Sequence, residues 1–305
     1  MTALTGIHVF EKRGVIEWEP AIVAMQLLSA LSWKRYHGKI ELYTNEPWLE
    51  VLKRYGVDSV YDIVDTEELK NQPPEIDHTK FWSWPKMHIA RTLTPDRVML
   101  DTDLWITSAI VLDQGSDFMG FHEEVPSSTD PITPYPDFDD MIPTDMIGRF
   151  DKLVLPMNAA ILWIQNSELR DKWLETAHRI VTSPYSIKVD DPRQVIHAVF
   201  VEQRLLPMIA NELGAKSATF LPCKYLTDSE VVATGDCWIP RPTEWSPTQR
   251  LTVEKVRHVW GCKRLWTFDE PLRIHQFHVI AHELSRYSNV YNVQQLVDSL
   301  ISYPS

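Results

Sequence analysis

Glycine is scarce in this chain of 305 residues, which has only 10. Neither G-x-G-x-x-G nor G-x-x-x-x-G-K-[ST] occurs. This argues against a dinucleotide-binding Rossmann enzyme and against a P-loop NTPase, because both need glycines to bring backbone against phosphate. A nucleotide bound here would need its phosphates neutralised in another way, and a metal ion is the obvious candidate.

Cysteine and long apolar runs are also scarce. The 3 cysteines, Cys223, Cys237 and Cys262, are odd in number and scattered, which excludes a disulfide scaffold and fits a reducing cytosol. No run of about 18 apolar residues occurs, so no membrane-spanning helix is expected. Residues 1–14 lack the apolar core of a signal peptide, and we therefore expect a cytoplasmic protein.

Positive charge is in the minority, with 30 Lys+Arg against 42 Asp+Glu and a net charge of −12. This balance disfavours a non-specific nucleic-acid binder. Hydrophobic residues make up 44% and charged residues 24% of the chain, which supplies ample core material and excludes intrinsic disorder. The length fits one large α/β domain or two closely packed ones.

Strand-like and helix-like stretches alternate over the first 65 residues. The predicted order is strand, helix, strand, helix, strand, over residues 7–10, 18–36, 39–44, 47–55 and 57–64. This order predicts an α/β fold with a mostly parallel central sheet and helices on both faces.

Further elements are expected along the rest of the chain. We predict strands that begin at residue 97 and over 117–122 and 157–164. We predict helices over 85–93, 167–181, 196–213 with a kink at Pro207, 272–284 and 293–301. Residues 126–143 hold five prolines and predict a long irregular loop, of the kind that is usually functional in compact domains. Residues 258–263 are expected in another loop.

The strongest chemical signal is Asp101-Thr102-Asp103, which follows the apolar residues 98–100. This places two carboxylates at the carboxyl edge of a parallel sheet, where open α/β sheets bind ligands. Carboxylates one residue apart point to opposite faces of a strand, but both can converge on one cation where the chain turns. Oxygen ligands suit Mg²⁺ or Mn²⁺. The alternative is a solvated turn at the end of a strand.

The segment 98–105 resembles the D-x-D segment of glycosyltransferases of GT-A fold, which holds a divalent metal on a nucleotide-sugar diphosphate. Four further short segments occur in the same order along the chain as in such enzymes. Lys86 comes ahead of the D-x-D strand, and Met157-Asn158-Ala159-Ala160 is similar to the motif F-N-[AS]-G. The pair Glu202-Gln203 and the element His258-x-x-Gly261-x-Lys263 follow. The last resembles the H-x-x-G-x-x-K element of family-8-type retaining enzymes, one residue shorter between Gly261 and Lys263. Glu202 stands where Asp is commoner.

The resemblance implies a single GT-A-like domain over 1–305. Within it, about 1–106 form the nucleotide-binding half, about 107–265 the sugar and acceptor half, and 266–305 the C-terminal helices. The implied metal ligands are Asp101, Asp103 and His258. The implied donor contacts are Lys86, Asp101, Asn158, Gly261 and Lys263, and the implied catalytic residues are Gln203 and Glu202.

Each of these side chains also has a structural interpretation. Taken alone, Lys86 fits a solvated helical lysine, Asn158 a turn residue, His258 a loop histidine satisfied by backbone, and Glu202-Gln203 an exposed pair at a helix start. The cysteines fit small buried hydrophobes.

The resemblance further implies a metal-dependent transfer of a sugar from a UDP-sugar, with retention of configuration. Imidazole beside two carboxylates favours Mn²⁺ over Mg²⁺. A glycan, a lipid-linked sugar or a protein is the favoured acceptor, since nucleic-acid phosphates need Lys and Arg. Two alternatives stay open: a nucleotidyltransferase of related fold, and a non-catalytic nucleotide-sugar-binding module.

Histidine and tryptophan form two further patterns. His275, His278 and His282 share one helix face. Without H-E-x-x-H we interpret them as histidines of a half-buried face rather than as a zinc site. Trp82 and Trp84 lie in a proline-flanked stretch and are the candidates for exposed platforms that stack on a sugar or on uracil.

Overall fold

The computed structural model describes residues 4–124, 138–184, 196–220, 224–225, 256–259, 266–291 and 293–302. All that follows concerns these residues. The three cysteines and most of the predicted loop 126–143 lie outside them.

A seven-stranded sheet of order β3-β2-β1-β4-β8-β6-β9 runs through the molecule. Its strands are β1 (Thr5–Phe10), β2 (Lys39–Thr44), β3 (Ile63–Asp65), β4 (Arg97–Leu100), β6 (Phe118–Gly120), β8 (Ile161–Ile164) and β9 (Ser217–Thr219). Strand β8 is antiparallel to both of its neighbours, and the other pairs are parallel. The predicted α/β class with a mostly parallel central sheet is confirmed.

Two short ladders lie beside this sheet. Strand β11 (Val256–His258) pairs antiparallel with β5 (Leu104–Ile106), and β10 (Lys224–Tyr225) pairs parallel with β7 (Glu123–Glu124). The first ladder brings a segment from late in the chain against the residues that follow β4.

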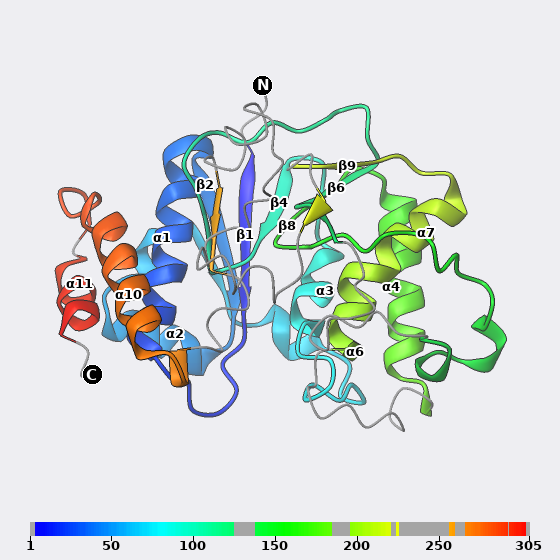
Figure 1. Cartoon of the computed structure of the whole chain (residues 1–305), viewed down its shortest axis with the longest axis horizontal. Helices are drawn as coiled ribbons and strands as arrows, with labels where there is room; N and C mark the ends of the chain where they lie inside the picture. Colours follow the sequence, from blue (N-terminus) through cyan, green and yellow to red (C-terminus); the bar gives the residue numbers. More distant parts are fainter. Residues whose placement is uncertain are drawn as a thin grey trace.

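Helices cover both faces of the sheet (Figure 1). On one side lie α1 (Glu19–His37) and α2 (Glu46–Arg54), with α10 (Glu270–Ser285) and α11 (Gln294–Ile301) outside α1. On the other side lie α3 (Trp84–Ala90), α4 (Ser167–Val181), α6 (Ile196–Val199) and α7 (Leu205–Leu213). Short 3-10 turns occupy Asp58–Val60, Glu68–Asn71, Asp139–Met141 and Thr144–Met146.

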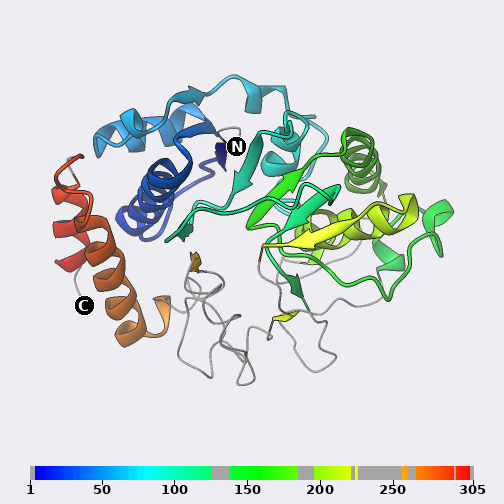
Figure 2. The ribbon, with the colours of Figure 1, turned by 90° about the horizontal axis from the view of Figure 1, so that it is seen from above.

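Helix α1 lies between the sheet and the C-terminal helices, as the view from above shows (Figure 2). It is therefore buried on nearly all sides, and its polar residues Gln26, Ser29 and Ser32 are buried with the apolar ones. A helix that is apolar all round is expected in such a sandwiched position. The helix ends at Gly38, whose φ of 96° is a conformation that residues with a Cβ rarely adopt.

Several predicted elements differ in the structure, and the predicted strand 157–164 begins only at Ile161. The predicted strand 57–64 is a 3-10 turn, Asp58–Val60, followed by a strand that begins only at Ile63. The predicted helix 196–213 contains a π-helical turn at Phe200–Arg204. Pro207 follows as the third residue of α7. It cannot donate to the carbonyl of Gln203, four residues earlier, and that carbonyl accepts from the amide of Met157 instead.

The strand order indicates where on the sheet a ligand would bind. Strands β1 and β4 are neighbours, and the chain runs from β1 to β2 on one side but from β4 towards β6 on the other, so the connections leave these two strands in opposite directions. In open α/β sheets, ligands bind outside the carboxyl ends of the strands at such a point. Asp101 follows β4 directly at this edge.

Among the described helices, none is both long enough and apolar enough to cross a bilayer.

Candidate active site

The chain turns directly after β4, and the turn carries both aspartates. The amide of Asp101 donates to the carbonyl of Ala160 at 2.8 Å, and the amide of Leu104 donates back to the carbonyl of Asp101 at 3.3 Å. The carbonyl of Asp103 accepts from Val259 at 3.0 Å. Because the backbone turns here, the two carboxylates are freed from the alternation of a strand.

Asp101, Asp103 and His258 come together at this turn. Each offers one ligand atom, and these atoms all lie within 4.8 Å of one another. The Nε2 of His258 is 3.5 Å from Oδ1 of Asp103 and 3.9 Å from Oδ2 of Asp101. Within the described ranges, no other three such side chains gather in this way. Two hard oxygens and one imidazole nitrogen suit Mn²⁺, or Mg²⁺ with added water.

His258 reaches the site from a strand, not from the loop that we expected. It is the last residue of β11 and lies opposite Leu104 in the ladder with β5. The ladder ties it to the residue that follows Asp103, which explains how a residue so distant in sequence meets the D-x-D turn. Gly261 and Lys263, the other members of the same predicted element, lie outside the described residues.

Lys86 of α3 is the cation of the site, rather than a solvated helical lysine. Its Nζ lies 2.6 Å from Oδ1 of Asp101, 2.8 Å from Oε1 of Glu202 and 2.6 Å from the carbonyl oxygen of Ala159. These three oxygens match the three protons of an ammonium group. Burial alone would lower the pKa of Lys86, but the carboxylates of Asp101 and Glu202 raise it above its usual value.

The carboxyl group of Glu202 is buried, with 5% of its side chain exposed. It projects from the π-helical turn at Phe200–Arg204, a distortion that is frequent at functional sites. Burial raises the pKa of Glu202 above its usual range, Lys86 opposes the rise, and Asp101 adds to it. The predicted exposed pair at a helix start is therefore wrong for Glu202, while Gln203 is half-buried.

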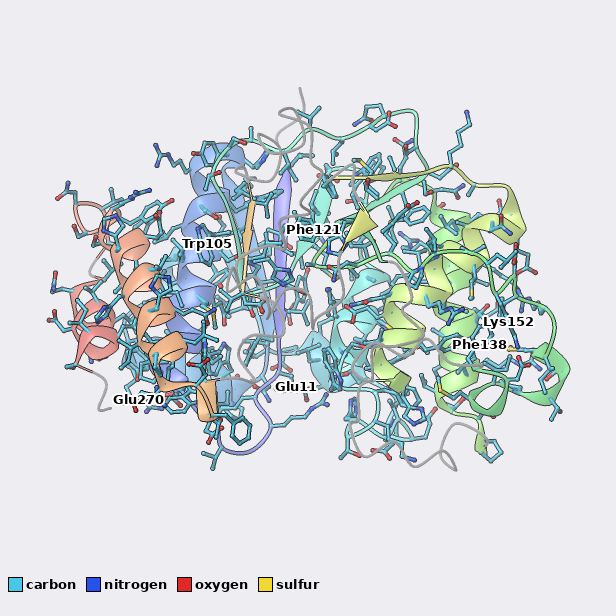
Figure 3. The ribbon with its side chains drawn as sticks, viewed as in Figure 1. Glu11, Trp105, Phe121, Phe138, Lys152 and Glu270 are labelled. Atoms are coloured by element: carbon cyan, nitrogen blue, oxygen red, sulfur yellow. The ribbon has the colours of Figure 1, made fainter. Side chains whose placement is uncertain are left out.

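Aromatic and basic side chains support this turn from outside. Phe138 packs on Phe200 with ring centroids 4.8 Å apart, and the guanidinium of Arg204 lies 4.8 Å from the Phe138 ring. The Nζ of Lys152 is 5.4 Å from the same ring. Figure 3 shows Phe138 and Lys152 together near α4, away from Trp105.

The segment ahead of β8 is held by several backbone hydrogen bonds. Asn158 is buried, and its Oδ1 accepts from the amide of Ala160 at 2.9 Å. Its own amide donates to the carbonyl of His122 at 2.8 Å. Gly120 permits the close approach of this segment, since a Cβ there would lie 2.2 Å from Met157. The Gln203 carbonyl accepts from Met157 at 2.9 Å.

Two buried histidines near the site escaped the sequence analysis. Burial lowers the pKa of His122 to about 3, and its ring neighbour Phe121 meets His258 edge to face at 5.7 Å. Burial also lowers the pKa of His8 on β1 to about 3. The signal that could have revealed them is a histidine inside an apolar strand, for His8, or shortly after one, for His122.

The predictions for the tryptophans and for the three histidines of α10 are confirmed only in part. Trp82 is 50% exposed, as an aromatic platform requires, whereas Trp84 and Trp105 are buried, so Trp84 cannot be a platform. His275, His278 and His282 lie on an exposed face of α10 rather than on a half-buried one. They are not among the metal-ligating groups found in the described part of the chain.

No protein-family model matches this sequence, and no curated protein matches it. Among solved structures, the chain is similar to the galactosyltransferase LgtC in complex with donor and acceptor sugar analogs, at 12% identity and a TM-score of 0.48, over 99% of this chain and 98% of that one. It is similar to the glycosyltransferase GlyE of Streptococcus pneumoniae TIGR4 at 12% identity and a TM-score of 0.44, over 97% of this chain and 64% of that one. It is also similar to mouse xyloside xylosyltransferase 1 in its apo form, at 13% identity and a TM-score of 0.44, over 85% and 98%. At identities this low, function has to be inferred from the site residues themselves.

Proposed function

We propose that this chain is a metal-dependent glycosyltransferase that transfers a sugar from a UDP-sugar to an acceptor, with retention of configuration. The observation that carries the proposal is the set Asp101, Asp103 and His258, with ligand atoms within 4.8 Å of one another, at the carboxyl edge of β4. The neighbouring Lys86 supports it by holding Asp101 in place, since its ammonium group bonds to Asp101, to Glu202 and to the carbonyl of Ala159.

The chemistry follows from the leaving group. When the bond between a sugar and a nucleoside diphosphate breaks, negative charge develops on the β-phosphate. A divalent cation held by Asp101, Asp103 and His258 supplies positive charge at that phosphate. Lys86 donates a hydrogen bond to Oδ1 of Asp101, so that Oδ2, on the side of His258, is the oxygen we propose as the metal ligand. In this proposal Gly261 and Lys263, which lie outside the described residues, contact the diphosphate.

The sugar side of the site is proposed for the residues around β8 and the π-helical turn. We assign a donor contact to Asn158. We propose Glu202 and Gln203 as the catalytic residues, with Gln203 beside the anomeric carbon. Glu202 also orients Lys86, which lies 2.8 Å from its carboxylate. We propose retention of the anomeric configuration because the Gln203 and His258 elements resemble those of retaining enzymes. Proton NMR during hydrolysis of a UDP-sugar tests this, since the anomer with the donor's configuration should appear before the other.

The acceptor is proposed to be a glycan, a lipid-linked sugar or a protein. The net charge of −12 disfavours nucleic acid, whose phosphates need Lys and Arg. Exposed Trp82 is the aromatic side chain that we propose for stacking on a sugar or on uracil.

The first test is calorimetric titration of UDP, with and without Mn²⁺, on the wild type, on Asp103→Asn and on the control Asp171→Asn. Asp171 is a surface aspartate of α4. We expect Mn²⁺-dependent UDP binding by the wild type and by Asp171→Asn, and its loss in Asp103→Asn, which removes one anionic ligand at nearly constant shape. Absence of UDP binding in both metal conditions would overturn the proposal.

Two assays separate the alternative functions. Hydrolysis of a UDP-sugar without acceptor identifies an enzyme, whereas a binding module leaves the UDP-sugar intact. Pyrophosphate released from a nucleoside triphosphate in the presence of a sugar phosphate would instead identify a nucleotidyltransferase.

A further inference from the structure

A row of buried polar side chains leads from α2 to the carbonyl of Asp101, and we call it the His8 chain. Its members, in order, are Trp48, Gln26, Tyr61, His8 and Ser29. All of them are at most 8% exposed. Buried polar groups are costly unless they are hydrogen-bonded, and each member of this row meets the next.

The proton positions can be assigned from the Asp101 end. The carbonyl of Asp101 only accepts, so the Ser29 hydroxyl, 3.4 Å away, donates to it. The Ser29 oxygen must then accept from His8, whose Nε2 is 2.9 Å away. This places the single ring proton of neutral His8 on Nε2 and leaves Nδ1 as an acceptor.

The other end gives the same assignment. The indole N–H of Trp48 only donates, and it reaches Oε1 of Gln26 at 2.8 Å. The Gln26 amide nitrogen therefore faces the Tyr61 hydroxyl at 2.9 Å and donates to it. The Tyr61 proton is then left for Nδ1 of His8, also 2.9 Å away. Burial keeps His8 neutral, since it lowers its pKa to about 3.

Helix α1 also holds the far end of the same segment. Ser32, one turn after Ser29, accepts from the amide of Ile106 at 3.1 Å and donates to the carbonyl of Ser29 at 2.8 Å. The two serines thus contact both ends of residues 101–106, which include Asp103. The backbone that presents both carboxylates is anchored to a helix that is itself buried on nearly all sides.

We propose that the His8 chain positions the metal-binding turn. The Tyr61 hydroxyl fixes the tautomer of His8, and this tautomer commits the Ser29 proton to the Asp101 carbonyl. Without the Tyr61 hydroxyl, His8 can carry its proton on Nδ1, and its Nε2 then competes for the Ser29 proton. The Asp101 carbonyl loses a donor in that tautomer, and the turn loosens. The inference rests on the proposed metal site, and His8, Tyr61 and Ser29 are positioning residues in it.

The test compares Tyr61→Phe with Tyr43→Phe. Tyr43, on β2, is a matched control, since it is as buried as Tyr61. Its hydroxyl donates to Glu41 at 3.2 Å, which is not a member of the His8 chain. Nitrogen-15 NMR of the metal-free protein reports the His8 tautomer. We expect Nε2–H in the wild type and in Tyr43→Phe, and an added Nδ1–H population in Tyr61→Phe.

The second readout is the Mn²⁺ dissociation constant, measured from the electron paramagnetic resonance of free Mn²⁺. Removal of a residue that orients metal ligands typically weakens binding about 10- to 100-fold, and we expect about 10-fold in Tyr61→Phe and in Ser29→Ala. Tyr43→Phe should bind as the wild type does. A purely structural role would lower the unfolding temperature of these variants without changing the dissociation constant.

The outcomes are separable. A wild-type His8 protonated on Nδ1, or equal Mn²⁺ affinity in wild type and Tyr61→Phe, overturns the inference while the proposed metal site stands. A wild type that binds no Mn²⁺ overturns the proposed function and the metal part of the inference together. In that case, hydrogen exchange at the Leu104 amide, which donates to the Asp101 carbonyl, decides whether the His8 chain holds the turn. Equal exchange rates in Tyr61→Phe and Tyr43→Phe would overturn this structural part of the inference as well.

Discussion

At the scale of single residues, Lys86 organises the site. Its ammonium group is shared among Asp101, Glu202 and the carbonyl of Ala159, which belong to three separate segments of the chain. Removing one partner of a buried ionic group leaves the others uncompensated, which is strongly destabilising. The same contact restricts Asp101 to presenting one oxygen on the His258 side, so the lysine acts on both stability and ligand geometry.

We therefore expect Lys86→Met to lower the free energy of unfolding by about 3–5 kcal/mol, since it leaves two carboxylates unpaired. Urea denaturation measures this change. Lys53→Met is the control, because Lys53 pairs with Glu50 on the surface, and its stability should match the wild type. Adding Glu202→Gln to Lys86→Met should recover part of the loss. Equal stability of Lys86→Met and Lys53→Met would contradict this account of Lys86.

At the scale of elements, α4 supports the π-helical turn that carries Glu202. The indole N–H of Trp173 on α4 donates to the carbonyl of Val201 at 2.9 Å. A π-helical turn leaves the regular bonding pattern of the helix, so its carbonyls need partners from elsewhere. Helix α4 begins at an Asn166 cap whose Oδ1 accepts from Leu169 at 3.1 Å, which fixes its register against the turn.

Trp173→Phe is expected to lower the free energy of unfolding by about 1–3 kcal/mol, because a buried carbonyl loses its donor. It should also slow UDP-sugar hydrolysis, since the π-helical turn that carries Glu202 loses the contact of its Val201 carbonyl with α4. Trp163→Phe is the matched control. Trp163 is equally buried, and its N–H donates to the carbonyl of Pro95 at 2.8 Å, before β4 begins. Parallel losses of hydrolysis in both variants would argue against a role for Trp173 in the site.

Patterns within one element were predictable, and contacts between elements were not. The bounds of α4 and β2 match the predicted ranges 167–181 and 39–44, because periodicity and caps are local. Asp101 and Asp103 were predicted because they are separated by one residue only and follow an apolar strand. The pairing of Lys86 with Glu202, and the strand that carries His258, depend on tertiary packing. The polar residues of α1 were noted only as interruptions of an apolar run, because their partners lie on other elements.

At the scale of the whole molecule, burial keeps His8 and His122 in the neutral form at neutral pH. Burial lowers the pKa values of His8 and His122 to about 3. In the unfolded chain a histidine takes up a proton below about pH 6.5. Between about pH 6.5 and 3 the unfolded state therefore binds more protons than the folded state, and the free energy of unfolding falls as the pH falls.

Each of these histidines is expected to contribute a slope of about 1.4 kcal/mol per pH unit within that window. Denaturation at a series of pH values should show a shallower dependence in His122→Gln than in the wild type. The control His275→Gln replaces an exposed histidine of α10 and should keep the wild-type slope. An unchanged slope in His122→Gln would mean that His122 is protonated in the folded protein.

The site draws on segments spread over most of the chain, from His8 on β1 to His258 on β11. A ribosome delivers the aspartates of the D-x-D turn long before it delivers the histidine. At about 5–20 residues per second, roughly 10–30 s separate Asp103 from His258. During that interval the nascent chain holds two carboxylates and a lysine but no third ligand. Prematurely terminated chains that lack β11 are therefore expected to bind no nucleotide sugar at this site, and the proposed diphosphate contacts Gly261 and Lys263 emerge later still.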